Sequence, residues 1–103
     1  MNFEDIKLLK LSDGVVSLAL NRPGKRNALS ENMIKELVTA INIIDKDKDC
    51  RLIKLEGEGE VFCAGGDLEW MREQANSTRG KRINEARKLA KMFRILNSVF
   101  KPI

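Results

Sequence analysis

A short apolar run that ends in two adjacent glycines is the most informative part of this chain. It occupies residues 59–69, which read Gly59-Glu60-Val61-Phe62-Cys63-Ala64-Gly65-Gly66-Asp67-Leu68-Glu69. Two glycines in a row remove the Cβ atoms that would block a ligand, and they allow backbone angles that are closed to other residues. Asp67 is a common residue at a helix N-terminus, so the pattern predicts a strand-to-helix corner with a helix that starts there.

The backbone N–H groups of such a corner are available to a ligand. They have no partner inside the helix and lie at the positive end of its dipole. They can therefore stabilise a carbonyl oxygen that is becoming negative, which is the role of an oxyanion hole. The alternative is that Gly65 and Gly66 only turn the chain, as most glycine pairs do. The corner alone leaves both interpretations open.

The length and composition indicate a small globular unit. At 103 residues the chain is one domain or a piece of a larger one, and its 43% hydrophobic and 33% charged residues exclude a disordered chain. No apolar run is long enough to cross a bilayer. The acidic start at residues 1–5 lacks the basic and apolar regions of a secretory signal. We therefore expect a cytoplasmic protein without a membrane partner.

Histidine is absent, and the only thiols are those of Cys50 and Cys63. This composition argues against a structural zinc site and excludes a Ser-His or Cys-His nucleophile pair within the chain. We expect no metal, and we expect both cysteines to be reduced and partly buried. Any chemistry must then use backbone dipoles, carboxylates or a bound cofactor.

The charge is distributed unevenly along the chain. Residues 1–70 hold 10 basic and 13 acidic side chains, whereas residues 71–103 hold 9 basic and 2 acidic ones. A basic helical segment can attract the phosphates of nucleic acid or of a cofactor. The alternative is a solvated helix face that pairs with acidic surface elsewhere.

Hydrophobic periodicity and turn residues predict interleaved strands and helices. The predicted strands are 6–11, 15–20 and 52–55, and the predicted helices are 31–45, 67–72 and 81–98. The first two strands should form a hairpin, Ser30 should cap the first helix, and residues 74–80 should form a loop. Lys101-Pro102 should end the last helix. This order predicts an α/β fold.

The last helix is expected to bury one apolar stripe. The stripe consists of Ile83, Ala86, Leu89, Ala90, Phe93, Leu96 and Val99. Trp70 and Met71 are expected to pack against the core, and Glu69, Glu73 and Glu85 to lie on the surface. Because a parallel strand should follow such a helix, we expect residues 1–103 to be a single, truncated domain.

A second motif precedes the first helix and carries a family resemblance. It reads Asn21-Arg22-Pro23-Gly24-Lys25-Arg26-Asn27-Ala28-Leu29-Ser30. Together with residues 62–68 it closely resembles the enoyl-CoA hydratase/isomerase (crotonase) family, and the resemblance extends through residues 69–72 and 97–103. It implies the N-terminal part of a crotonase-like (ClpP/crotonase) spiral of ββα units. Residues 67–72 look most like the members that hydrate methylglutaconyl-CoA.

The resemblance implies a catalytic backbone group and a coenzyme path. In this family two backbone N–H groups hold a thioester carbonyl as it becomes an enolate, and Gly66 is in the position of one donor. The second donor would come from a Gly-Gly-Gly loop beyond Ile103. Lys25 and Arg26 would meet phosphate, or would alternatively be turn charges. The residues expected to line coenzyme A are Ala28, Ala64, Gly65, Gly66, Asp67 and Leu68.

The resemblance also implies the form in which coenzyme A is bound and the oligomeric state of the protein. Coenzyme A is expected only as part of an acyl-CoA thioester substrate, with no permanently bound cofactor. Relatives of full length form trimers and hexamers. Asp67 has the alternative role of a helix cap whose carboxylate is turned away from the ligand.

The two glutamates that family hydratases use for acid–base chemistry lie beyond this sequence. Such groups contribute on the order of 10²–10⁴ in rate, so we expect the segment alone to be almost inactive. Double-bond isomerisation, thioester hydrolysis and decarboxylation remain open as alternatives to hydration. An RNA-binding module and an inactive remnant are the alternatives from other classes; RNA is the less favoured partner because stacking aromatics are not evident.

Overall fold

Strand β2 (Val15–Leu20) is the centre of a three-stranded sheet with the order β1-β2-β3. This arrangement is seen in a computed structural model, which describes residues 2–98. Strand β1 (Ile6–Lys10) pairs with β2 antiparallel, as the predicted hairpin requires. Strand β3 (Leu52–Gly57) pairs with β2 in parallel, so an α-helix lies between these two strands in the sequence. The α/β fold class is thereby confirmed.

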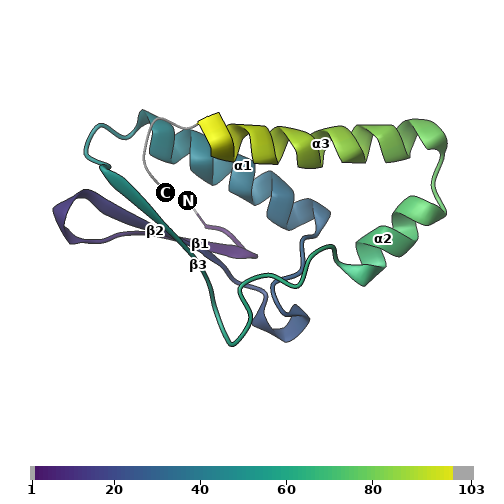
Figure 1. Ribbon diagram of the computed structural model, residues 1–103, viewed down its shortest axis with the longest axis horizontal. Coiled ribbons are helices and arrows are strands. Elements are labelled where there is room, and N and C mark those ends of the chain that lie inside the picture. The colour runs from purple at the N-terminus through teal and green to yellow at the C-terminus, as the bar shows by residue number, and fades with distance from the viewer. Residues whose placement is uncertain (1, 99–103) are drawn as a thin grey trace.

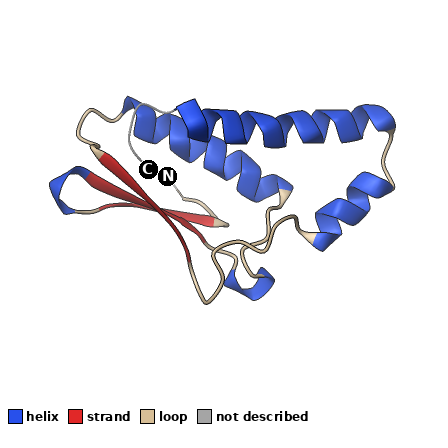
Figure 2. Cartoon of the chain, in the orientation of Figure 1, coloured by secondary structure: helices blue, strands red, loops and turns tan. Residues whose placement is uncertain are grey.

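Helix α1 (Glu31–Lys46) packs between the sheet and the long helix α3 (Arg79–Ser98). Figure 1 shows this succession of layers, and Figure 2 shows the three strands on one side of α1 with α3 on the other. The Ser30 hydroxyl accepts a hydrogen bond from the Met33 N–H, which confirms the predicted cap. The apolar residues of α1 are buried at helical spacing; they are Met33, Ile34, Leu37, Ala40, Ile41 and Ile44.

Helix α2 (Leu68–Ala75) is longer than predicted, and α3 begins earlier. The loop predicted at 74–80 is therefore wrong over most of its length. The Thr78 hydroxyl accepts a hydrogen bond from the Lys81 N–H and so caps the N-terminus of α3. The polar composition of this segment, taken alone, suggests a loop. The chain turns between the two helices within residues 76–78.

The face that α3 buries differs from the predicted stripe. Ile83 and Phe93 are 42% and 53% exposed, whereas Glu85 and Met92 are 4% and 2% exposed. Leu89 and Leu96 do pack partly against the core. Val99 and the predicted helix end at Lys101-Pro102 lie outside the described residues.

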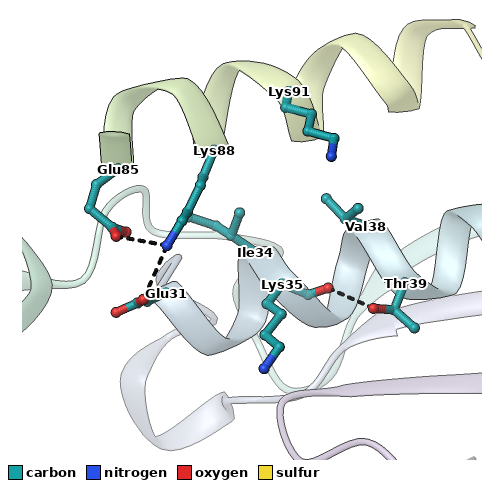
Figure 3. A pocket seen from close by; sticks show the side chains of 8 residues that line it. All are labelled: Glu31, Ile34, Lys35, Val38, Thr39, Glu85, Lys88 and Lys91. Carbon is teal, nitrogen blue, oxygen red and sulfur yellow. Dashed lines mark hydrogen bonds and ion pairs between the residues drawn. The ribbon is translucent and has the colours of Figure 1, made fainter. Parts of the chain in front are cut away.

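Glu85 faces α1, so its predicted surface position is wrong. Its carboxylate accepts a hydrogen bond from Lys88 Nζ at 3.0 Å, and the same Nζ lies 3.5 Å from Glu31 Oε1 of α1 (Figure 3). The Glu85 carboxylate raises the pKa of Lys88 above its ordinary value. These charges border a hollow of about 420 Å³ between the two helices, with Ile34 and Val38 among its apolar residues.

The remaining expectations about single side chains are mostly confirmed. Glu69 and Glu73 are exposed, and Trp70 packs partly against the core. Cys50 is buried and Cys63 is partly buried, and neither forms a disulfide. No helix within residues 2–98 is long and apolar enough to cross a membrane.

Gly57 at the end of β3 is required by a close approach of the chain to itself. An added Cβ would lie 2.6 Å from the Phe62 carbonyl oxygen and 2.9 Å from Asn27 Nδ2. We predict that Gly57→Ala lowers the free energy of unfolding by about 1–3 kcal/mol, because the backbone must move to admit the methyl group.

Denaturant titration with matched variants measures this effect. Gly24→Ala is the control, since a Cβ at Gly24 meets nothing within 4 Å and the residue has no left-handed backbone. Equal unfolding midpoints for the two variants would contradict the prediction.

Candidate functional site

The two sequence motifs meet side by side in a short parallel ladder. The Ala64 N–H donates to the Arg26 carbonyl at 3.0 Å, and the Leu29 N–H donates to the Gly65 carbonyl at 2.6 Å. The Asp67 N–H returns to the Leu29 carbonyl at 2.8 Å. The loop after β2 and the glycine corner before α2 are thus joined by backbone hydrogen bonds.

The N–H of Gly66 points away from this ladder. The Gly65 carbonyl and the Gly66 N–H belong to one trans peptide group and point in opposite directions, and the Gly65 carbonyl faces Leu29. The Gly66 N–H must therefore face the other side, where it donates to no acceptor among residues 2–98. It lies just before α2, at the positive end of the helix dipole. The Gly66 N–H thus has a fixed direction, and the dipole of α2 favours its binding to an oxygen atom that carries negative charge.

Gly65 and Gly66 have different reasons to be glycine. Gly65 has a φ of 99°, a backbone conformation that side chains disfavour, although a Cβ there would meet nothing within 4 Å. A Cβ at Gly66 would approach Met71 Sδ at 3.0 Å. Met71 is half exposed beside Gly66, so the prediction that it packs against the core is wrong.

Asp67 caps α2, which is the alternative role given for it. Oδ1 accepts a hydrogen bond from the Trp70 N–H at 2.9 Å, and Oδ2 accepts one from Arg22 Nη2 at 3.0 Å. The Trp70 N–H above all, with help from Arg22, lowers the pKa of this buried carboxyl below its ordinary value of 3.8. The carboxylate is thus committed to the protein, and what Asp67 can offer a ligand is its backbone.

Two residues that no sequence argument selected organise the loop. Asn27 is fully buried with a φ of 56°, and its side chain donates to the Glu58 and Val61 carbonyls at 2.8 Å each. Its Oδ1 accepts a hydrogen bond from the Arg22 N–H at 2.7 Å. The signal for Asn27 is its residue type, because asparagine tolerates the left-handed region. Nothing local marks Arg22, whose partners are distant in the sequence.

The residues predicted to meet coenzyme A differ in accessibility. Lys25 and Arg26 are exposed, and neither side chain has a hydrogen bond or ion pair with another described residue. Arg26 borders a hollow of about 470 Å³ together with Pro23 and residues 58–61. These two cations are free to bind phosphate, and that role stays a prediction.

The other predicted lining residues lie around the same ladder. Ala64 and Gly65 are exposed and Leu68 is 75% exposed, whereas Ala28 is buried and its carbonyl accepts a hydrogen bond from Arg22. Gly66 is partly buried. Within residues 2–98 no three histidine, cysteine, aspartate or glutamate side chains are grouped to hold a metal ion.

Comparison with known proteins identifies the family. The sequence model of the enoyl-CoA hydratase/isomerase family matches residues 15–103. This chain belongs to that family. The crystal structure of an enoyl-CoA hydratase from Shewanella pealeana superimposes with a TM-score of 0.92 at 31% identity, covering 97% of this chain and 37% of that one. The predicted crotonase-type fold is therefore confirmed over nearly the whole chain.

Relatives within the family differ in the reaction for which they are named. The mitochondrial Δ(3,5)-Δ(2,4)-dienoyl-CoA isomerase of Mus musculus is 40% identical over 67 residues, which are 65% of this chain and 20% of the isomerase. The hydroxycinnamoyl-CoA hydratase-lyase of Pseudomonas fluorescens is 36% identical over 66 residues, covering 63% and 24% of the two chains. The chain thus spans about a fifth to a quarter of the length of these relatives.

Substitutions at the two glycines should have unequal effects on stability. We predict that Gly65→Ala lowers the free energy of unfolding by about 1–3 kcal/mol, since alanine is strained at a φ of 99°. Gly66→Ala should be nearly neutral, because the exposed Met71 side chain can move aside. Urea unfolding of both variants measures the difference, and a neutral Gly65→Ala variant would show that the corner relaxes without strain.

Acidification should remove the stability that Asp67 contributes as an anion. A carboxylate whose pKa is lower in the folded state stabilises the protein above its unfolded pKa, and this contribution is lost as pH falls through the folded pKa. Asp67→Asn keeps a capping oxygen and loses the charge. We predict that the stability difference between wild type and Asp67→Asn shrinks as pH falls below 3.8. Chemical unfolding at a series of pH values measures it, and a constant difference would be the contrary result.

Proposed function

We propose that this chain provides the acyl-CoA-binding segment and one oxyanion donor of an enoyl-CoA hydratase-type enzyme. The observation that carries the proposal is the Gly66 N–H, which faces away from the ladder and has no acceptor among residues 2–98. Membership of the enoyl-CoA hydratase/isomerase family supports acyl-CoA as the substrate class.

The chemistry follows from where negative charge develops. When water loses a proton to a base and adds to the β-carbon of an α,β-unsaturated thioester, the electrons of the double bond move to the carbonyl oxygen and form an enolate. A donor aimed at that oxygen stabilises the transition state by about 3 kcal/mol, and the positive end of α2 strengthens it. The α-carbon then takes a proton to complete the hydration.

The coenzyme end of the substrate would lie along the loop after β2. Lys25 and Arg26 are exposed cations in that loop, and the Arg26 carbonyl is bonded to Ala64 of the corner. Coenzyme A bound by these cations would then run along the loop toward the corner that holds Gly66. Methylglutaconyl-CoA is the specific substrate we propose, on the resemblance of residues 67–72.

Double-bond isomerisation is a second candidate reaction. It is favoured by the 40% identity to a protein named as a dienoyl-CoA isomerase. Isomerisation passes through the same type of enolate, so it needs the Gly66 N–H equally. We further propose that the whole enzyme is a cytoplasmic homo-trimer or hexamer.

Nuclear magnetic resonance of the amide groups tests the proposal on this chain. We predict that crotonyl-CoA moves the Gly66 amide proton downfield, because the N–H gains a carbonyl acceptor. Adenosine 3′,5′-bisphosphate lacks the thioester, and it should move the signals of Lys25 and Arg26 but leave Gly66 in place.

A variant and its matched control test the phosphate end of the ligand. Lys25→Gln should weaken binding of both ligands, whereas Lys48→Gln removes an exposed cation in the turn after α1 and should leave binding unchanged. A Gly66 amide that stays in place when crotonyl-CoA saturates the protein would exclude its role as an oxyanion donor.

A further inference from the structure

Arg22 connects segments that are far apart in the sequence. Its Nη2 donates to Asp67 Oδ2 at 3.0 Å, and its Nη1 donates to the Ala28 carbonyl at 2.6 Å. Its Nε lies 3.8 Å from Asp5 Oδ1, just before β1. One guanidinium thus joins the start of the sheet, the loop after β2 and the residue that follows Gly66.

The partners of Arg22 flank the bridge that orients Gly66. Ala28 precedes Leu29, and Asp67 follows Gly66, so the guanidinium holds one neighbour of each bridged residue. The side chains of Arg22 and Asp67 are only 17% and 9% exposed. Charge-assisted bonds shielded from water are stronger than surface ion pairs, and the planar guanidinium fixes their directions.

We propose that Arg22 is a positioning residue for the oxyanion donor. It fixes the separation of the two ladder segments and thereby the direction of the Gly66 N–H. A displacement of about 1 Å at a donor of this kind costs orders of magnitude in rate. The proposal rests on the proposed function for the use of that N–H, and on the described contacts for its orientation.

The variant Arg22→Lys tests this role. Lysine keeps the positive charge but lacks the planar guanidinium, whose two separate nitrogens donate to Asp67 and Ala28. We expect the Gly66 amide resonance of the free protein to shift, the hydrogen exchange of the bonded Leu29 amide to accelerate, and the affinity for crotonyl-CoA to fall about tenfold. Arg72→Lys is the matched control, because Arg72 is an exposed arginine of α2 that makes no side-chain bond among the described residues.

A second variant covers the case in which Arg22→Lys does not fold. Asp67→Asn retains the cap on Trp70 and removes the charge that Arg22 binds. Its effect is read as the hydrogen-exchange rate of the Leu29 amide, whose bond to the Gly65 carbonyl opens if the two ladder segments separate. The Leu29 chemical shift alone is not used, because the Leu29 carbonyl accepts a hydrogen bond from the Asp67 N–H. Faster exchange of the Leu29 amide with weakened binding supports the proposal.

The outcomes distinguish the positioning role of Arg22 from the proposed function in acyl-CoA chemistry. If crotonyl-CoA does not bind the wild type, the proposed function fails, while the Gly66 and Leu29 amides of the free variants still decide the role of Arg22. Unchanged amides in folded variants overturn it. A variant whose amide resonances shift but whose affinity for crotonyl-CoA equals that of the wild type also overturns it.

Discussion

The candidate site depends on one backbone bridge, between Leu29 and Gly66. The hydrogen bonds on either side of Gly66 fix the planes of its peptide groups, so the N–H has a single direction without help from a side chain at that position. A donor made in this way is rigid and needs no proton transfer to act. It can stabilise negative charge on an oxygen whatever reaction produces that charge, which fits a family whose members are named for different reactions.

The bridge requires that the loop after β2 keeps its shape, and the buried polar side chain of Asn27 stabilises this loop. Arg26 and Asn27 are consecutive residues in the left-handed region, a conformation that is unfavourable for non-glycine residues. The Asn27 side chain compensates by satisfying two carbonyls of the turn after β3. The amide thus holds the two loops together, because an apolar side chain at this position would leave both carbonyls without this donor.

Much of this architecture could be predicted from the sequence because its signals are local. Helix α1 has a capping serine and a regular apolar spacing, and the strands of the hairpin end at turn residues. The capping role of Asp67 is predictable for the same reason, because aspartate is common at helix N-termini. The ladder between the motifs is different, since no spacing rule says that two loops pair, and only the family resemblance implied that they share a site. Arg22 was missed because its partners are far away in the sequence.

The orientation of α3 could not be predicted because its composition is ambiguous. Apolar and basic side chains alternate around the whole helix, so periodicity alone does not select a face. In the structure Met92 packs into the core and Glu85 lies buried beside Lys88, whereas Ile83 and Phe93 are outside. Burial of a carboxylate beside a lysine is a tertiary effect, and a rule that glutamate is exposed on helices fails there.

The parallel pairing of β2 with β3 also bears on the order in which the chain folds. The β1–β2 hairpin closes over a short turn, whereas β3 can join β2 only after the segment that contains α1 has been brought back across the sheet. Pairings between distant parts of a chain are slow to form because chain entropy opposes them before any contact is gained. The glycine corner follows β3 and pairs with the loop after β2, so this contact also joins distant parts of the chain, and chain entropy opposes its formation in the same way.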